Sequence, residues 1–291
     1  MSDRAAIALH KASVAYRVES GQAKQVWSDI SMNILRGDWV AVVGRNGSGK
    51  STLASVLLEL CPLSSGQLLK DREGLTIRGV LQIPDTQFVG DTVEEELQHI
   101  PLAEDISAEA RKMKYEEVLS RVGLQVPVGR LLASLSGGQK QLVNIAAALA
   151  AEPDILVLDE PTAMLDPAAR HDVLRAVKEA HQRGTTIVWI THRMEEVAEA
   201  SRVVAFGEGR IAYDGCPKEF FYGQSSGPAC GKSELSQSAG TIHEGILPPY
   251  QRLGVEPPFV VQTALLLMDQ GWELHPLPLC AEELAEAVKM L

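Results

Sequence analysis

The sequence predicts an α/β fold in which a mainly parallel sheet is covered by helices on both faces. Short apolar segments at 39–43 (WVAVV), 155–159 (ILVLD) and 185–190 (TTIVWI) lack the alternation of half-exposed strands. From residue 153 onward, strands of this kind alternate with helical periodicity, which is typical of parallel sheets. With 291 residues, 45% of them hydrophobic, the chain can form one large domain with an appendage, or two modest domains.

The first part of the chain, from residue 1 to about 81, consists mainly of predicted strands. The strand at 39–43 is followed by GRNGSGKST and then by a helix that we expect to end near Pro62. Apolar residues at helical spacing predict the buried face of that helix, namely Leu53, Val56, Leu57 and Leu60.

The second part, from about 82 to 152, has a helical pattern. The segment from Thr92 to Glu95 resembles a capping box, in which the two side chains satisfy free amides at a helix start. A helix over 107–122 is predicted by the spacing of Tyr115, Val118, Leu119 and Val122. After residue 153, Asp166 and Pro167 suit the N-cap and first position of a further helix, with Val173, Leu174 and Val177 on its apolar side.

The third part is small. Residues 223–241 are rich in Gly and Ser and predict a flexible linker. Beyond it, 257–272 and 281–291 have the pattern of two short amphipathic helices. We therefore expect a main domain over 1–222, with its helical part at about 82–152, the linker at 223–241 and a helical appendage over 242–291.

Charge and composition narrow the class of protein. The net charge is −11 and the pI is about 5.2, and no run rich in Lys and Arg is present, so we expect no nucleic-acid partner. We see no signal peptide at the N-terminus and no apolar run near the roughly 18 residues of a membrane span. The four cysteines are scattered, without metal-binding spacing, and favour a reduced cytosolic protein.

The stretch from Gly44 to Ser51 fits the pattern G-x-x-x-x-G-K-[ST] in full, between a predicted strand and a helix. Its glycines allow backbone amides to curl around phosphate oxygens, and the helix N-terminus adds partial positive charge. Lys50 is expected to reach the β- and γ-phosphates and Ser51 to hold Mg²⁺. The expected nucleotide-binding residues are Gly44, Arg45, Asn46, Gly47, Ser48, Gly49, Lys50, Ser51 and Thr52.

A second element places two carboxylates at the end of the buried strand ILVLD. Open α/β sheets bind ligands at the carboxyl ends of their strands. Asp159 is expected to hold Mg²⁺, and Glu160 to act as general base on the attacking water. Two acidic residues at a strand end do not by themselves predict a nucleotide site, because many strands end in this way. The prediction depends on the presence of the Lys50 loop upstream.

The segment LSGGQ at 135–139 is the signature of ATP-binding cassette (ABC) proteins, which this chain resembles from about residue 5 to 222. The resemblance implies a P-loop ATPase domain with an N-terminal antiparallel β part, a helical signature subdomain and a C-terminal helical appendage. It also implies that two chains face head to tail with two ATP molecules between them. Ser136, Gly137, Gly138 and Gln139 would then meet ATP held by the partner, again as a helix N-terminus facing phosphate.

Four lesser motifs follow from the same resemblance. Tyr16 matches the aromatic residue that stacks on adenine, and Gln82 matches the glutamine that contacts Mg²⁺ and the water and couples to a membrane partner. Asp166 matches a residue that acts across the dimer. His192 matches the histidine that touches the γ-phosphate.

The stretch QIPDTQFVGDTVEEEL at 82–97 is similar to ATP-binding proteins of energy-coupling factor (ECF) transporters, the cobalt and vitamin importers, as is the C-terminal segment. This resemblance implies a peripheral subunit on the cytoplasmic face of the cell membrane, using ATP and Mg²⁺. Its partners would be a second ABC ATPase (a paralogue or a second copy), a transmembrane coupling protein and a substrate-binding membrane subunit.

Two alternatives remain open at this point. A soluble ABC ATPase acting on DNA or ribosomes usually carries coiled-coil arms, zinc modules or two cassettes, and none is evident here. A degenerate cassette with only a structural role is opposed by the presence of Glu160 and His192. One departure from the family pattern is Leu142, where Arg is usual, and it could weaken a contact of the helical part.

Overall fold

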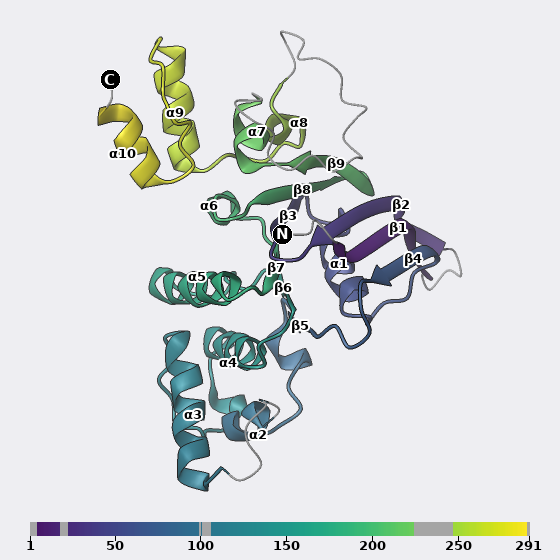
Figure 1. Cartoon of the computed structure of the whole chain (residues 1–291), viewed down its shortest axis with the longest axis vertical. Helices are drawn as coiled ribbons and strands as arrows, with labels where there is room; N and C mark the ends of the chain where they lie inside the picture. The colour runs from purple at the N-terminus through teal and green to yellow at the C-terminus, as the bar shows by residue number, and fades with distance from the viewer. Residues whose placement is uncertain (1–4, 18–22, 99, 101–105, 224–246, 290–291) are drawn as a thin grey trace.

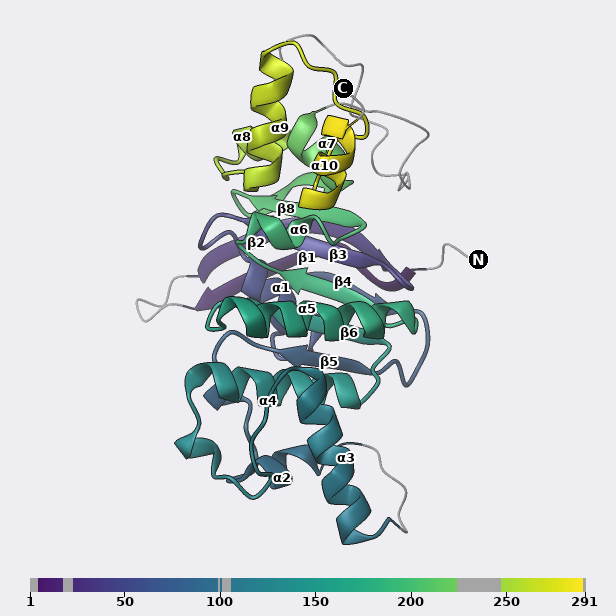
Figure 2. The ribbon, with the colours of Figure 1, turned by 90° about the vertical axis from the view of Figure 1, so that its left-hand side faces the viewer.

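The computed structural model describes residues 5–17, 23–98, 100, 106–223 and 247–289. Along the long axis of the molecule the helices α2 to α4 lie at one end, the two sheets in the middle, and α7 to α10 at the other end (Figure 1). The same order is seen from the side (Figure 2). The predicted linker at 223–241 lies outside the described residues except for Gly223, which ends α7 (Pro217–Tyr222) with a positive φ.

The larger sheet has six strands in the order β5-β6-β7-β3-β8-β9. Five of them run parallel: β5 (Ile77–Val80), β6 (Ile155–Asp159), β7 (Thr186–Ile190), β3 (Trp39–Gly44) and β8 (Arg202–Gly207). The last, β9 (Arg210–Gly215), pairs antiparallel with β8. The three strands predicted from apolar runs are thus confirmed as neighbouring central strands.

Both faces of this sheet are covered, as the lack of alternation predicted. Along β3, Trp39, Ala41 and Val43 join one hydrophobic cluster, and Val40 and Val42 join the other. The first cluster is completed by helices that include α3 (Ala108–Arg121), α4 (Gly137–Ala150) and α5 (Pro167–Gln182). The second is completed by α1 (Lys50–Leu57) and by the smaller sheet.

The smaller sheet is antiparallel, with strand order β2-β1-β4, and forms the expected N-terminal β part. It consists of β1 (Ala5–Arg17), β2 (Ala23–Leu35) and β4 (Ser65–Lys70). Its inner side chains, such as Trp27, Met32 and Ile34, are buried with Leu53 and Leu57 of α1. The sheet thereby fixes α1, and with it the loop that precedes α1.

Helix α1 is shorter than the sequence predicted. It ends at Leu57, with the chain turning at Leu58 and Glu59, which has a φ of +58°. Leu53, Val56 and Leu57 are buried, but Leu60 is 65% exposed. The prediction for Leu60 was therefore wrong, because the residue lies beyond the helix whose periodicity was extended to it.

The helical part contains α2 (Val93–Leu97), α3 and α4, with short 3₁₀ turns η1 (Pro84–Thr86) and η2 (Leu132–Ser134). The capping box at Thr92 and Glu95 is confirmed, with both hydrogen bonds present. Tyr115, Val118, Leu119 and Val122 are buried as predicted. Leu142 is also buried, so this side chain packs in the hydrophobic core where Arg is usual in the family.

The C-terminal part contains α8 (Pro249–Arg252), α9 (Phe259–Asp269) and α10 (Ala281–Lys289), and α9 and α10 are the two predicted helices. Asp166 caps α5 with Pro167 at its first position, as predicted. The remaining helix, α6 (Met194–Val197), lies directly after β7. No helix in the described ranges is both long and apolar enough to cross a lipid bilayer.

Candidate nucleotide-binding site

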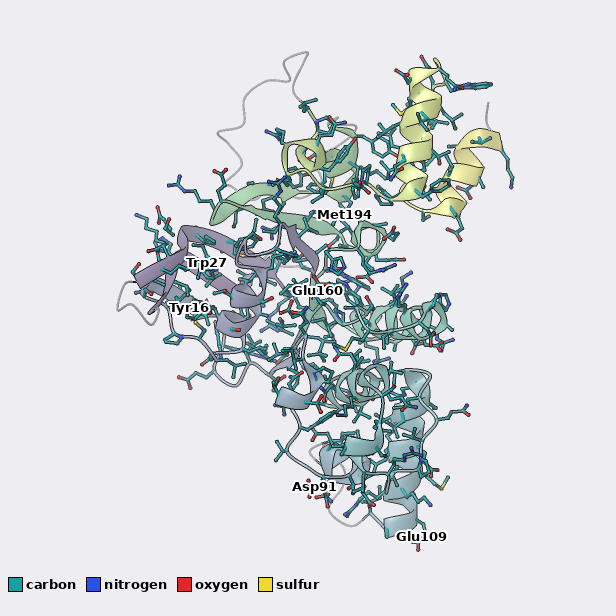
Figure 3. All side chains as sticks on the ribbon, turned by 180° about the vertical axis from the view of Figure 1, so that it is seen from behind. Tyr16, Trp27, Asp91, Glu109, Glu160 and Met194 are labelled. Atoms are coloured by element: carbon teal, nitrogen blue, oxygen red, sulfur yellow. The ribbon has the colours of Figure 1, made fainter. Side chains whose placement is uncertain are left out.

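The sheet register brings the predicted catalytic side chains to one edge. Val80 of β5 is level with Leu158 of β6, and Asp159 is level with Ile190 of β7. Gln82, Glu160 and His192 follow these strands by one or two residues, and the Gly44 loop follows β3, next to β7. Glu160 lies near the middle of the molecule, between the β part with Tyr16 and the Met194 helix (Figure 3). The predicted motifs therefore share the carboxyl edge of one sheet.

In the loop from Gly44 to Gly49, two positions require glycine because neighbouring atoms leave no room for a Cβ atom. Gly44 has a φ of +144°, and a Cβ atom there would lie 2.4 Å from the carbonyl oxygen of Phe206. Gly49 has a φ of +100°, and a Cβ atom there would lie 2.4 Å from Cδ1 of Trp27. Since Trp27 is fully buried under the smaller sheet, it has no room to move away.

Replacing Gly49 by Ala is expected to destabilise the folded chain. The left-handed backbone costs a non-glycine residue about 1–2 kcal/mol, and overpacking against Trp27 adds about 1–3 kcal/mol. Urea unfolding should therefore show a free energy of unfolding that is lower in the variant by about the sum of these two costs, and a correspondingly lower midpoint. Gly47→Ala is a matched control, because its φ of +79° carries the backbone cost while a Cβ atom there meets nothing within 4 Å. Equal losses in both variants would contradict the role given to Trp27.

Lys50 begins α1 and is 7% exposed. Its Nζ donates hydrogen bonds to the carbonyl oxygens of Gly44, at 2.9 Å, and Arg45, at 3.2 Å. Burial lowers the pKa of Lys50, and the nearby carboxylates of Glu160 and Asp159 oppose that shift. An anion placed in the loop would favour the charged ammonium further, so the site is suited to phosphate.

Asp159 and Ser51 are the residues predicted to hold Mg²⁺. Asp159 is 3% exposed, and burial raises the pKa of its carboxyl group, while a hydrogen bond from the Ser51 hydroxyl and the charge of Lys50 lower it. Its Oδ1 is buried without a hydrogen-bond partner in the described part of the chain. An orphaned carboxylate oxygen beside a hydroxyl is a donor set suited to Mg²⁺, so these residues fit that ion.

Asp159→Asn is expected to stabilise the chain in the absence of nucleotide at neutral pH. The folded state raises the pKa of Asp159, so ionised Asp159 costs stability above its ordinary pKa, and that cost is absent below it. The gain in the variant should therefore be present at pH 7 and shrink as the pH falls toward the ordinary range of Asp. Thermal unfolding of both chains between pH 7 and pH 4 measures it. A gain that stays constant over this range would show that ionisation is not its cause.

Glu160 and His192 lie against each other across two strand ends. Nδ1 of His192 is 2.6 Å from Oε2 of Glu160, and the His192 side chain is 59% exposed. Burial raises the pKa of Glu160, while the charge and hydrogen bond of His192 oppose the rise. A raised pKa brings a carboxylate closer to the working pH of a general base. The backbone of Glu160 has a φ of +52°, which is unusual for a residue other than glycine.

Tyr16 lies at the end of β1, beside the start of α1. Its ring is exposed enough to receive a ligand, at 45%, and its hydroxyl accepts a hydrogen bond from the Cys61 thiol at 3.5 Å. The contact with Cys61 and burial raise the pKa of Tyr16, and the neighbouring Thr52 hydroxyl opposes the rise. Tyr16 and Thr52 thus meet at the edge of the phosphate-binding loop, where a base attached to the phosphates could stack.

Two glutamines follow β5, and the structure separates their roles. Gln82 is exposed. Gln87 instead braces the segment, because its Nε2 donates to the carbonyl of Gly79 and its Oε1 accepts from the amide of Leu81. Lys140 of α4 forms an ion pair with Asp85 in the same segment. The exposed Gln82 is the one that can contact a ligand at the sheet edge.

The signature segment forms the capped start of helix α4. The Ser136 hydroxyl accepts from the Gln139 amide, and the Gln139 side chain accepts from the Ser136 amide. The amides of Gly137 and Gly138 head α4 and have no partner one turn back in that helix. A Cβ atom added at either glycine would approach Met164, and one at Gly138 would also approach Leu165.

Two of the residues predicted to act on the nucleotide also cap helices. The Gln139 side chain is used for capping, and the Asp166 side chain caps α5 by accepting from Ala169 at 2.9 Å. The side-chain hydrogen bonds of Ser136 and Gln139 do not join them to the phosphate-binding loop in the described part of the chain. The role of this segment toward a ligand held by a second chain stays a prediction.

Sequence reasoning missed two contributors to the site. Trp27 shapes the Gly49 turn, and Glu196 forms a buried hydrogen-bond network behind Glu160 and His192. A glutamate in a short acidic helix, MEEV, carries no sequence signal that distinguishes it from an exposed neighbour. Its role is visible only once the β6 and β7 ends are side by side.

Comparison with known proteins agrees with this geometry. The sequence pattern described as ABC transporter matches residues 27–163. A solved ATP-binding cassette dimer in a post-hydrolysis state, bound to ADP and Pi, is similar in fold, with a TM-score of 0.65 over 72% of this chain and 98% of that one, at 24% identity. The fold is therefore that of the ATP-binding cassette (ABC) class.

More similar relatives define the family within that class. Energy-coupling factor transporter ATP-binding protein EcfA1 of Halalkalibacterium halodurans is 35% identical, over 95% of each chain. EcfA of Enterococcus faecium is 37% identical over 74% of this chain and 80% of its own. The structure of cbiO1 from Clostridium perfringens, part of the ABC transporter complex cbiONQ, has 30% identity and a TM-score of 0.60 over 75% of this chain and 90% of that one. The chain belongs to the family of energy-coupling factor transporter ATP-binding proteins.

Proposed function

We propose that this chain is the ATP-hydrolysing subunit of an ECF-type importer and works as one half of an ATPase pair. The observation that carries the proposal is that the Lys50 loop, Asp159, Glu160 and His192 share one sheet edge, while the signature segment forms the start of a separate helix, α4. A single chain thus offers a nearly complete nucleotide site and an unused phosphate-binding helix end. Two chains facing head to tail complete each other.

Within each site, different residues bind ATP and hydrolyse it. Lys50 and the loop amides hold the ATP phosphates, Tyr16 stacks on the base, and the amides of Gly137 and Gly138 of the partner chain close over the γ-phosphate. Ser51, Asp159 and Gln82 would hold Mg²⁺, which would supply positive charge that neutralises the phosphates. Glu160 takes a proton from the attacking water, and His192 holds the Glu160 carboxylate and contacts the γ-phosphate.

The energy of this cycle is passed to membrane proteins at the cytoplasmic face of the cell membrane. The partners we propose are a second ABC ATPase, a transmembrane coupling protein and a substrate-binding membrane subunit that selects a vitamin or a transition-metal ion. The helical appendage over 242–291, following the linker at 223–241, is proposed to contact the partner ATPase. Relatives named as transporter ATP-binding proteins, and the neighbour in a transporter complex, support this assignment.

A tagged pull-down from detergent-solubilised membranes, followed by mass spectrometry, tests the proposal. We expect a second cassette ATPase, or only this chain in a dimer, together with integral membrane proteins. The membrane protein that varies among such complexes would reveal the class of imported substrate. Recovery of the chain in the soluble fraction, with DNA or ribosomes, would favour a soluble ATPase and leave the ATP site itself unaffected.

A further inference from the structure

A buried carboxylate lies directly behind the catalytic edge of the sheet. Glu196 belongs to α6, four residues after His192, and is 4% exposed. Burying a carboxylate is costly unless several donors compensate it. Its neighbour Glu195, on the same short helix, is exposed. The acidic sequence of the helix does not explain why Glu196 is buried while Glu195 is exposed.

Donors from two separate segments surround the Glu196 carboxylate. Oε2 accepts from the indole Nε1 of Trp189 at 2.8 Å and from the hydroxyl of Thr191 at 2.7 Å. Oε1 accepts from the hydroxyl of Thr162, and Nε of Arg193 lies 3.5 Å from the same oxygen. Every oxygen of this carboxylate thus has partners, and the group links elements rather than capping its own helix.

The two linked segments are those that carry the catalytic pair. Thr162 lies two residues after Glu160, in the turn after β6, and Thr191 and Arg193 flank His192 after β7. The backbones of these segments meet at only one hydrogen bond beyond the sheet ladder, from the Glu160 amide to the Ile190 carbonyl, at 3.0 Å. The Glu196 side chain adds a second, side-chain connection between them.

This connection matters because the contact it supports is short and exposed. The 2.6 Å contact between Glu160 and His192 involves a histidine side chain that is mostly in solvent. Glu160 also has a left-handed backbone, which needs surrounding structure to hold it. Small shifts of either strand end would separate the two side chains, and misplacement of about 1 Å can cost 10²-fold in rate.

We propose that Glu196 is a positioning residue that sets the relative placement of Glu160 and His192 by holding Thr162 on one segment and Thr191 on the other. The inference rests on the catalytic roles proposed for Glu160 and His192. It predicts that the loss of the carboxylate lowers the turnover of bound ATP and leaves ATP binding intact, since Glu196 has no contact with the Lys50 loop among the described interactions.

The test compares Glu196→Gln with Glu195→Gln in the full chain, alone and with the proteins that co-purify with it. The glutamine has the same shape, but its amide group turns a donor toward donors at Thr162 or at Trp189 and Thr191. We expect kcat for ATP hydrolysis to fall by roughly 10- to 100-fold in Glu196→Gln, with KM and the Kd for ATP unchanged. Glu195→Gln should retain the wild-type values. A wild-type kcat in Glu196→Gln, or a loss confined to thermal stability, would overturn the proposal.

A double-mutant cycle separates positioning from general weakening of the fold. In a His192→Ala background the Glu196→Gln substitution should have little further effect on kcat, because the pair it aligns is already broken. Full additivity of the two losses would contradict the inference. If Glu196→Gln does not fold, Thr162→Val and Thr162→Ser provide the same comparison, and Ser, which keeps the hydroxyl, should retain more of the rate than Val. Equal rates in these two variants would overturn the proposal.

A parallel Glu160→Gln chain distinguishes failure of this inference from failure of the proposed function. An unchanged kcat in Glu160→Gln would overturn the catalytic role of Glu160 itself, and the positioning role that depends on it. A Glu160→Gln chain that has lost hydrolysis, beside a Glu196→Gln chain of wild-type kcat, would overturn only the role of Glu196.

Discussion

Replacing Glu160 by Gln is expected to lower ATP hydrolysis by roughly 10²- to 10⁴-fold, the range that a general base contributes. Glutamine keeps the shape of the side chain and can still contact His192, but it cannot take a proton from water. Because Lys50, Ser51 and the loop are unchanged, ATP should still bind, and the pair of chains should accumulate in the closed, ATP-bound state. Phosphate release measures the rate, and size-exclusion chromatography with light scattering measures the dimer.

Glu179→Gln serves as the control for this experiment. Glu179 is exposed on α5, so its substitution removes the same charge without touching the site. We expect this variant to hydrolyse ATP at the wild-type rate and to show no ATP-dependent dimer beyond that of wild type. Normal turnover by Glu160→Gln would falsify the role given to Glu160.

Replacing Lys50 by Ala is expected to abolish nucleotide binding at ordinary concentrations, raising the Kd for ATP by roughly 100-fold or more. A charge-assisted hydrogen bond contributes about 1.5–3 kcal/mol, and about 1.4 kcal/mol corresponds to a tenfold change in affinity. The substitution also removes the positive charge of Lys50 from the buried Asp159 and the half-buried Glu160, which adds to the repulsion of phosphate. Isothermal titration with a non-hydrolysable ATP analogue measures the affinity.

Two further variants test whether the loss of ATP binding is caused by the loss of the Lys50 charge. Lys50 is buried, so Lys50→Met fills the space that Ala would leave and removes the charge alone. We expect Lys50→Met to lose binding as Lys50→Ala does. Lys112→Ala, at an exposed position on α3 with a 4.0 Å ion pair to Glu116, should bind as wild type. Retained affinity in Lys50→Met would show that the ammonium group is not what holds the phosphates.

The predictions for Lys50 and Glu160 and the inference for Glu196 concern three different steps at the same site. Lys50 acts on binding, Glu160 on the chemical step, and Glu196 on the alignment of that step. Each therefore has its own signature in kcat, KM and ATP affinity. If a substitution at one of these residues changed a different quantity from the one predicted, the residue would have a different role.

Much of this site could be predicted from sequence because its motifs are local. The Gly44–Ser51 loop, the apolar strand that ends in Asp159 and Glu160, and the cap at Asp166 each depend on a few consecutive residues and their backbone preferences. Apolar runs without alternation correctly indicated a sheet covered on both faces. The prediction for Leu60 failed for a related reason, since periodicity alone does not mark where a helix stops.

The sequence by itself determined which residues can bind phosphate, hold a cation and accept a proton, because those capacities belong to residue types in short, recognisable patterns. Only the tertiary structure decided which of them meet. The strand order placed β6, β7 and β3 side by side, so that His192 contacts Glu160 beside the Gly44 loop. Glu196 shows the same division: three of its partners lie within seven residues of it, but Thr162 lies 34 positions away in the chain. Such contacts depend on how the strands pack against one another, and no local pattern encodes them.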